Sequence, residues 1–377
     1  MKPRTLLILI ALVAVLGVLA LWLARRPEAI PPPEAGQRLL TIPDVNTLTR
    51  VEISSGTQQV TLVRTGDDWA VETLWNFPAR FSQLADLLRG MDNLRVAEVL
   101  RGGTSVLGEF GLVDDSTNFP ARVKLYGPDG RLSDDVLFGN PRTAAAMPNT
   151  FSPPDSRYAR AGRGPVVLVE PFLTDIRRRP SDWIETALFD LRPDAITMMT
   201  AVPSNDAMYA ISRAPDGALT GINILQDKPI NGASADIWFR AFRAITAVTV
   251  VDPAIPHETL GRAEAEVAIA RASNGLIARV ELGAQADDAS ARYAWMTFDY
   301  EEPDPLQTDD AEAASADAAL RNATRNEVER LQREVSPWTF VFSFSQAQKF
   351  IFLRDQLIAA QSERTPAPEA DAPPGND

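Results

Sequence analysis

The chain has 377 residues but no cysteine and only one histidine, His257. Without cysteine it can form no disulfide, no thiolate zinc site, no iron–sulfur cluster and no cysteine nucleophile. A single histidine excludes a multi-histidine metal site and leaves little room for histidine-based catalysis. His257 lies in the predicted connection between two strands, and we interpret it as a surface or hydrogen-bonded residue rather than a catalytic base.

Several catalytic motifs are missing as well. The sequence contains no G-x-S-x-G, G-x-x-x-x-G-K-[ST], G-x-G-x-x-G or H-E-x-x-H motif, which argues against the corresponding nucleophile, phosphate, dinucleotide and zinc chemistries. A glycosidase needs two facing carboxylates, whereas neighbours in a strand point to opposite faces and neighbours in a turn point to water. This argument applies to the adjacent acid pairs Asp67-Asp68, Asp114-Asp115, Asp134-Asp135 and Asp287-Asp288. We therefore predict that the protein is not an enzyme and has no catalytic residues, no cofactor and no metal ion.

Positive charge is scarce, because 37 Lys and Arg stand against 50 Asp and Glu, for a formal net charge of −13. Nucleic acids and anionic lipid surfaces are poor partners for such a chain, since binding phosphates requires clustered basic residues. The one basic cluster, Arg177, Arg178 and Arg179, precedes Pro180, and we interpret it as a solvated loop. At about 100 to 200 residues per domain, the length favours two domains or one duplicated domain.

One long hydrophobic run lies near the start, at residues 6–23. As a helix rising about 1.5 Å per residue it covers roughly 27 Å, close to the hydrocarbon thickness of a bilayer. A cleavable signal peptide is the alternative, but its apolar core usually has only about 7–15 residues. Lys2 and Arg4 precede the run and Arg25 and Arg26 follow it, a narrow bias toward a cytoplasmic start. We expect a cytoplasmic stub at 1–4, a transmembrane anchor at 5–24 in the inner membrane, and the remainder in the periplasm or outside the cell.

The remainder predicts an α+β protein. Residues 25–40 include four prolines and form a semi-rigid spacer. A first α+β repeat is expected over 41–190, with short alternating strands and a helix that opens at Pro78. The buried stripe of this helix follows the i, i+3, i+4, i+7 pattern and consists of Phe81, Leu84, Ala85 and Leu88.

The same order recurs in a second repeat over 191–361. Trp238, Ala241, Phe242 and Ile245 repeat the helical stripe. A hairpin at 121–139 recurs at 265–283 with an offset of 144 residues at both strands, and a Gly follows an acid or amide residue in both turns. The tripeptide Arg157-Tyr158-Ala159 is answered by Arg292-Tyr293-Ala294. Equal spacing with matched turns predicts an internal duplication of antiparallel sheets, each with one helix.

The C-terminal part departs from this repeat. An acidic insertion at about 299–318 is interpreted as a solvated linker rather than a calcium loop, because the glycine that such loops use for their sharp turn is missing. Replacing its Asp310 should hardly change stability, in contrast to Phe242→Ala. C-terminal helices follow, the first with a thin stripe that could pair with another helix: Leu320, Thr324, Val328, Leu331 and Val335. Residues 362–377, with four prolines, are expected to be disordered.

Several packing and turn residues resemble a known family. They are Thr49 to Ile53, Gly66-Asp67-Asp68-Trp69, Leu84 to Leu88, Leu94 to Ala97, Phe110-Gly111-Leu112, Trp183 and Leu188 to Leu191. On these the chain is similar to a bacterial domain of unknown function, number 4340, found in membrane-anchored proteins. Its members are often encoded beside ABC transporter permeases and gliding-motility-type auxiliary proteins. The resemblance implies an accessory role at a membrane complex, with a permease as a partner, and it implies no catalytic residue.

Two functions remain open at this point. One is a non-enzymatic accessory or scaffolding protein of an envelope membrane complex, associated with an ABC-type transporter. The alternative is an extracytoplasmic module that binds a small ligand, a glycan or a peptidoglycan fragment. Its stacking surfaces would be exposed aromatic side chains such as Trp75, Phe77 or Trp295, although such residues are more often part of a core.

Overall fold

The computed structural model describes residues 33–40, 42, 45–100, 107–113, 120–142, 154–174, 176–224, 229–286 and 290–358. The predicted anchor at 5–24 and the predicted disordered tail at 362–377 lie outside these residues. None of the helices in the described ranges is long and apolar enough to cross a membrane. The chain divides into two compact units, Met1–Gln59 with Ser82–Arg178 and Val60–Phe81 with Arg179–Asp377.

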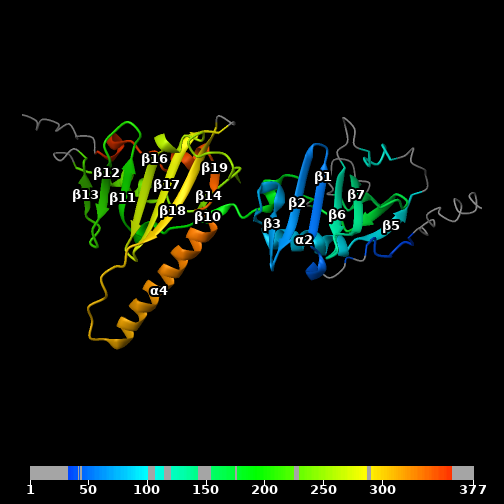
Figure 1. Ribbon diagram of the computed structural model, residues 1–377, viewed down its shortest axis with the longest axis horizontal. Helices are drawn as coiled ribbons and strands as arrows, with labels where there is room; N and C mark the ends of the chain where they lie inside the picture. The colour runs from blue at the N-terminus through cyan, green and yellow to red at the C-terminus, as the bar shows by residue number, and fades with distance from the viewer. Residues whose placement is uncertain are drawn as a thin grey trace, which may run out of the picture. The chain divides into compact units, whose positions relative to one another are not determined.

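The first sheet has nine strands in the order β4-β3-β2-β1-β6-β7-β8-β9-β5 (Figure 1). Buried apolar residues alternate with more exposed ones along its strands. In β1, Val51 and Ile53 are fully buried and their neighbours are not. The strands are β1 (Arg50–Ser55), β2 (Gln58–Thr65), β3 (Asp68–Val71), β4 (Phe77–Pro78), β5 (Arg95–Val99), β6 (Ala121–Tyr126), β7 (Leu132–Arg142), β8 (Ser156–Ala161) and β9 (Val167–Glu170). The helical elements of this part are η1 (Val45–Thr47), η2 (Glu72–Leu74) and α2 (Phe81–Asp92).

The second large sheet has eight strands in the order β13-β12-β11-β16-β17-β18-β19-β15, and β10 pairs with β14 in a small separate sheet. Its strands are β11 (Ile196–Val202), β12 (Tyr209–Arg213), β13 (Leu219–Ile222), β15 (Thr249–Val250), β16 (Glu266–Ala272), β17 (Leu276–Gln285), β18 (Ala291–Tyr300) and β19 (Thr339–Ser343); the small sheet holds β10 (Ala187–Phe189) and β14 (Ile245–Thr246). The helical elements are η4 (Pro180–Trp183), η5 (Pro193–Ala195), α3 (Gly232–Phe239), η6 (Arg262–Glu264), α4 (Ala311–Glu334), α5 (Phe344–Gln348) and η7 (Arg354–Leu357). Large antiparallel sheets with few helices confirm the α+β class.

The two large sheets share one strand order. The run β3-β2-β1-β6-β7-β8-β9-β5 corresponds strand by strand to β13-β12-β11-β16-β17-β18-β19-β15. In both, the next strand of the large sheet after the helix, β5 or β15, lies at the far edge of the sheet. This agreement matches the repeat seen in the sequence. The main difference is that α4 is inserted between β18 and β19, whereas a short turn joins β8 to β9.

A backbone contact recurs at the same place in both sheets. In the first, the Asn140 N–H donates a hydrogen bond to the Phe110 carbonyl oxygen at 2.9 Å. In the second, the Ala284 N–H donates to the Leu260 carbonyl oxygen, also at 2.9 Å. Each contact ties the loop before the central hairpin to the end of the hairpin's second strand.

Glycine makes both of these contacts possible. The residue after each accepting carbonyl is a glycine with a positive φ, Gly111 at 65° and Gly261 at 75°. The opposing strand residue is a second glycine: a Cβ atom on Gly139 would lie 2.2 Å from the Phe110 oxygen, and one on Gly283 would lie 2.4 Å from the Leu260 oxygen. We call each pair, Gly111 with Gly139 and Gly261 with Gly283, a glycine clip. Only a residue without a side chain fits there.

The predicted hairpin offset is wrong by one residue at the first strand. Val123 pairs with Val136, whereas Ala268, not Val267, pairs with Val280. The offset is therefore 145 at the first strand and 144 at the second. A register shift next to Leu125 accommodates the extra residue of the first hairpin.

The predicted helical stripes are partly wrong. Phe81 is the first residue of α2 and is 54% exposed, because the apolar face begins one turn later and consists of Leu84, Leu87, Leu88 and Met91. In the second repeat α3 ends at Phe239, and Ala244 has a positive φ of 48° that turns the chain into β14. Trp238, Phe242 and Ile245 are nevertheless fully buried, but only Trp238 is helical.

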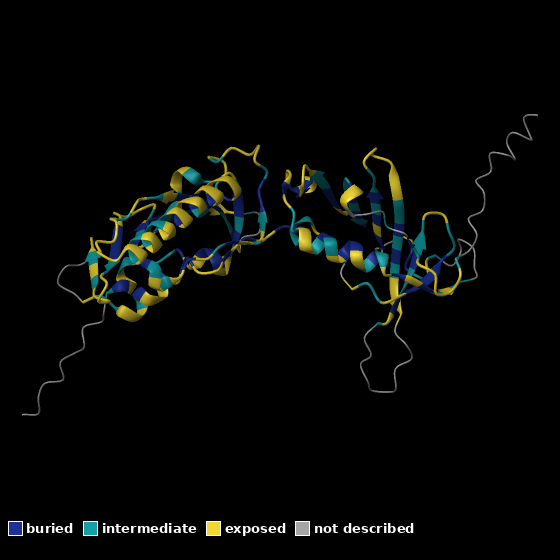
Figure 2. Cartoon of the chain, turned by 90° about the horizontal axis from the view of Figure 1, so that it is seen from below, coloured by how far each residue is buried: buried dark blue, intermediate teal, exposed yellow. Residues whose placement is uncertain are grey.

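Helix α4 packs on its own sheet. Thr324, Val328, Leu331 and Val335 are buried, and the helix contacts β17 and β18 (Figures 1 and 2). The predicted pairing of this stripe with another helix is therefore wrong, and its outermost member, Leu320, is 57% exposed.

Asp310 has a structural role that its sequence context did not indicate. Its carboxylate accepts hydrogen bonds from the Glu312 and Ala313 N–H groups and caps the N-terminus of α4. Replacing an N-cap aspartate with alanine typically costs about 1 kcal/mol, so the expected neutrality of Asp310→Ala is revised to a measurable loss.

Candidate functional site

A cleft with a volume of about 710 Å³ lies in the second unit. Its walls come from β3, β4, β10, the first residue of α2 and the C-terminal end of α4. Buried apolar side chains form its floor, the largest being Trp69, Phe77 and Leu188. Phe77 is fixed by an edge-on contact with Trp338, with ring centroids 4.8 Å apart. Phe81, half exposed at the helix start, extends the apolar wall to the surface.

Charged side chains line the rim of the cleft. Glu185 accepts a hydrogen bond from Arg80 at 3.0 Å, and Asp67 lies 3.9 Å from Arg64. Arg330 contacts both Glu327 and Glu334 on its own helix. Hydrogen bonding to Glu327 raises the pKa of Arg330 and, in turn, lowers the pKa of Glu327. Glu185, Arg330 and Glu334 are thus held in ion pairs.

The lining of this cleft combines apolar side chains with charged ones. Its titratable groups are the carboxylates of Asp67, Asp68, Glu185 and Glu334 and the guanidinium of Arg330. Its carboxylates face Arg80, Arg330 or solvent. An apolar floor with a few polar groups at the edge is the usual composition of a ligand or partner site.

A second, smaller cavity of about 220 Å³ lies beside Tyr209 and Arg354 in the same unit. Burial raises the pKa of Tyr209 to about 12, and its hydroxyl donates to the Phe352 carbonyl oxygen. Arg354 lies 3.1 Å from Asp206 and donates to the Ala207 carbonyl at 2.8 Å. These polar groups join the C-terminal segment to β12, which gives them a structural role.

His257 belongs to a polar chain on the second sheet. Its Nδ1 atom lies 3.0 Å from a guanidinium nitrogen of Arg262. Because arginine can only donate, Nδ1 is the acceptor of this hydrogen bond. Arg262 also donates to Glu281 at 2.7 Å, and Arg279 donates to the same carboxylate at 2.8 Å. The ring packs edge-on against buried Trp295, so His257 is a hydrogen-bonded residue, as predicted.

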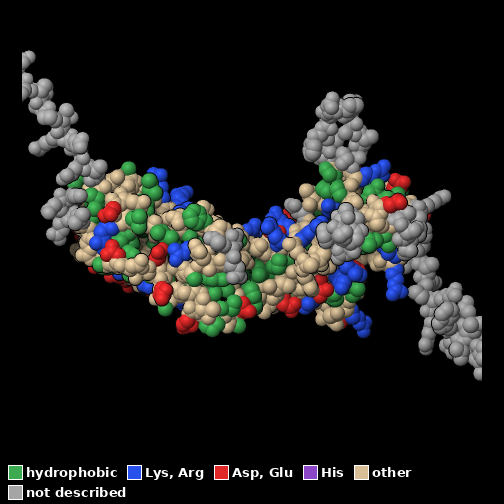
Figure 3. Space-filling view, turned by 90° about the horizontal axis from the view of Figure 1, so that it is seen from above, with side chains coloured by type: hydrophobic (Ala, Val, Ile, Leu, Met, Phe, Trp, Pro, Cys, Tyr) green, Lys and Arg blue, Asp and Glu red, His purple; other side chains and the backbone are tan. Residues whose placement is uncertain are grey.

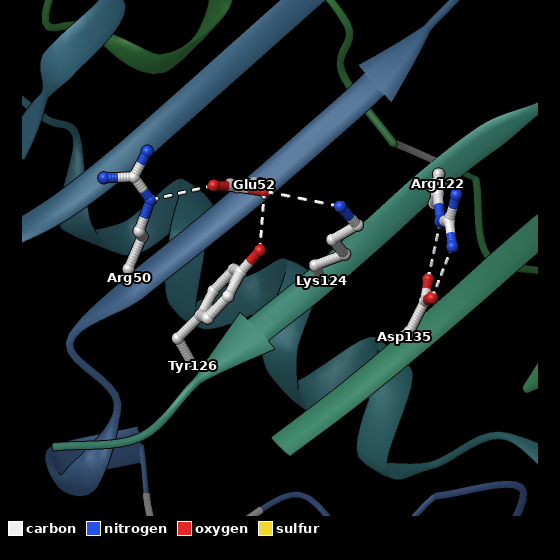
Figure 4. A network of polar contacts seen from close by, with 6 residues as sticks. All are labelled: Arg50, Glu52, Arg122, Lys124, Tyr126 and Asp135. Atoms are coloured by element: carbon white, nitrogen blue, oxygen red, sulfur yellow. Dashed lines mark hydrogen bonds and ion pairs between the residues drawn. The ribbon is translucent and has the colours of Figure 1, made fainter. Parts of the chain in front are cut away.

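A polar network covers one face of the first sheet (Figure 4). Glu52 accepts hydrogen bonds from Tyr126 at 2.8 Å and from Arg50 at 2.9 Å. Nearby, Arg122 makes two hydrogen bonds to Asp135, which lower the pKa of that carboxyl group. Burial together with the hydrogen bond to Glu52 raises the pKa of Tyr126. The network is a ladder of paired groups across β1, β6 and β7.

The adjacent acid pairs do not form a facing carboxylate site where the structure describes them. Asp67 and Asp68 occupy the turn and the start of β3, and Asp135 pairs with Arg122 while Asp134 accepts the Ser133 hydroxyl. The pairs Asp114-Asp115 and Asp287-Asp288 lie outside the described residues.

The acidic insertion is tied down by arginines. Glu302 pairs with Arg321 and Arg325, and Asp317 also pairs with Arg321. Glu301 contacts Arg271. Within the described ranges no three acidic or histidine side chains gather as a metal site would require.

The remaining sequence candidates divide between core and surface. Trp295 is 2% exposed and cannot act as a stacking platform, whereas Trp75 is 38% exposed but lines neither of the two cavities described above. Phe77 is the one that reaches the cleft floor. In the basic cluster, Arg179 pairs with Asp182.

The cleft itself could not be found from the sequence. Its walls come from segments near residues 65–81, 185–188 and 330–335, which only the folded chain brings together. Of the cleft residues, the sequence singled out Phe81, but as part of a buried helical stripe; in the structure this side chain is exposed.

Comparison with known proteins adds a family but no activity. A family model matches residues 69–259, just over half of the chain, and its description is "Domain of unknown function (DUF4340)". No curated protein and no solved structure gives a significant match.

Proposed function

Because the chain belongs to the DUF4340 family, whose description names no activity, we propose its function from the site: a non-enzymatic accessory or scaffolding protein of an envelope membrane complex, associated with an ABC-type transporter. The observation that carries the proposal is the 710 Å³ cleft, with its apolar floor and its rim of ion pairs. Such a site can recognise a partner through apolar contact and paired charges.

The membrane part of the proposal rests on the apolar run at 6–23 and on the spacer at 25–40. The bias of basic residues favours a cytoplasmic start, with the folded part periplasmic or extracytoplasmic. The transporter association rests on the family resemblance alone. The face drawn in Figure 3 carries both acidic and basic side chains. The formal net charge of −13 fits a protein partner better than nucleic acid.

Cross-linking in native membranes, followed by mass spectrometry of what co-purifies, tests this function. We expect a permease or another integral membrane subunit with the full chain, and its loss when residues 1–24 are deleted. Recovery of no membrane subunit would refute the accessory role. Protease added to intact spheroplasts should remove the folded part, and complete protection would reverse the topology.

The cleft also supports the second candidate, an extracytoplasmic module for a small ligand, glycan or peptidoglycan fragment. Trp69 and Phe77 lie on its floor, and aromatic faces are common in such sites. A muropeptide or oligosaccharide that saturably changes tryptophan fluorescence would favour this candidate. Phe77→Ala should then abolish the change, whereas Trp75→Ala should preserve it.

A further inference from the structure

The cleft of the second unit combines an apolar floor with a predominantly acidic rim. Four of its lining residues are carboxylates, namely Asp67, Asp68, Glu185 and Glu334, and one is a cation, Arg330. Arg330 already contacts Glu327 and Glu334, so its charge is compensated within α4. Arg80 pairs with Glu185 at 3.0 Å and Arg64 lies 3.9 Å from Asp67, yet both carboxylate side chains remain largely exposed, Glu185 at 59%. The carboxylates still outnumber the arginines that contact them, so an incoming ligand meets a net negative rim with apolar surface behind it.

We propose that this cleft binds a segment of a partner protein that carries a large apolar side chain next to lysine or arginine. The proposal rests on the proposed accessory function and specifies the partner's chemistry. The apolar side chain packs against Trp69 and Phe77, and the flanking cations face Asp68 and Glu185.

The cleft is large enough for an apolar side chain together with flanking residues of a bound segment. Its volume of about 710 Å³ exceeds that of one side chain and lies within the range of about 300–1,000 Å³ that is typical of small-molecule sites. Phe81 and Ala187 are exposed at its edge, so a chain can enter and leave without opening the fold. The buried anchor supplies most of the affinity, while each exposed charge pair changes it by about two- to fivefold.

Fluorescence anisotropy with the full chain in detergent micelles tests the proposal. The probe is a labelled peptide, Gly-Ser-Lys-Phe-Lys-Ser-Gly, with two matched peptides in which glutamates replace the lysines or serine replaces the phenylalanine. We expect the lysine–phenylalanine peptide to bind at least about tenfold more tightly than either control, because both the charge and the anchor contribute.

Variants of the cleft locate the binding. Ala187→Trp fills the opening with a bulky side chain at an exposed position and should abolish binding. Asp68→Lys combined with Glu185→Lys should invert the preference toward the glutamate peptide. Asp299→Lys, at an exposed carboxylate on β18 that does not line the cleft, is the matched control and should leave binding unchanged.

Equal binding of the lysine and glutamate peptides, or binding that survives Ala187→Trp in a chain with an unchanged circular dichroism spectrum, overturns the proposal. Either result leaves the accessory function standing if cross-linking still recovers a membrane subunit. Conversely, binding that follows the cleft variants supports the proposal even if no subunit is recovered, an outcome that refutes only the accessory role.

Discussion

The two large sheets share a strand order and a glycine clip but stabilise the region beside the clip in different ways. In the first sheet, the residue after Gly111 is Leu112, which is 3% exposed and packs as a core side chain. In the second, the residue after Gly261 is Arg262, which bonds to His257 and Glu281. The same backbone arrangement is therefore stabilised by apolar packing in the first sheet and by polar contacts in the second.

This difference separates what the fold requires from what it tolerates. The backbone contact at the clip needs glycine, because a Cβ atom would collide with a carbonyl oxygen. The side chains around the clip can be apolar or polar, provided that every polar side chain keeps its hydrogen-bond partners. A partly buried polar group that loses its partner is destabilising, so we expect His257, Arg262, Glu281 and Arg279 to contribute as a set.

The largest expected effect tests whether the helical stripes of the two repeats are equally buried, as the sequence predicted. Phe242 is fully buried, so Phe242→Ala should lower the free energy of unfolding by about 3–5 kcal/mol. Phe81→Ala, at a half-exposed residue, should change it by less than about 0.5 kcal/mol. Urea unfolding of both variants measures this, and equal midpoints would contradict the assignment of Phe242 to the core.

The second prediction tests whether both clips are structural. Gly139→Ala and Gly283→Ala each force a Cβ atom against a backbone carbonyl, and overpacking of this kind costs about 1–3 kcal/mol. Gly232→Ala is the control, because its Cβ atom would meet nothing within 4 Å at the start of α3. If only one clip variant is destabilised relative to this control, the two clips are not equivalent. Thermal unfolding of the three variants decides between these outcomes.

The third prediction converts the second sheet toward the first. Arg262→Leu alone leaves Glu281, whose side chain is 12% exposed, without one of its two donors, and should cost about 1–3 kcal/mol. Adding His257→Leu and Glu281→Leu removes the orphaned partners and should recover part of that loss. Hydrogen exchange of peptides from β17 measures both steps. A triple variant less stable than Arg262→Leu would show that the polar chain is required in its own right.

Local patterns predicted much of this fold. Alternation of Val123 and Leu125 with polar residues gave the central hairpin, and the Gly positions gave its turn. The one-residue register error arose because strand alternation alone does not place a bulge. The helix ends were missed for a related reason, since the turn at Ala244 depends on the fold and not on the apolar spacing.

The candidate site lay beyond such patterns. The cleft floor needs Trp69, Phe77 and Leu188 from distant segments, and none of them carries a motif. In the same way Asp310 looked like one acid among many, although its capping role depends on where α4 begins. A site or cap that depends on tertiary contacts cannot be predicted from the spacing of residues along the sequence.

The smallest expected effect concerns pH and the carboxylate that only the second sheet carries beside its clip. Burial acts to raise the pKa of Glu281, but hydrogen bonds from Arg262 and Arg279 outweigh it, and the pKa lies below the ordinary value of 4.5. A carboxyl group with a lowered pKa in the folded state stabilises the fold above its ordinary pKa and loses that contribution as the pH falls through the lowered value.

Stability of the second sheet should therefore be insensitive to Glu281 between pH 7 and about 5 and should decline through this group only below about pH 4.5. Because both arginines are partly exposed, the effect should stay near or below about 1 kcal/mol. Glu281→Gln should flatten the acid limb of hydrogen-exchange protection in β17, whereas Glu258→Gln, at an exposed carboxylate of the His257 loop, should not. An acid limb unchanged by Glu281→Gln would assign the pH dependence to other carboxylates and remove the proposed electrostatic difference between the two sheets.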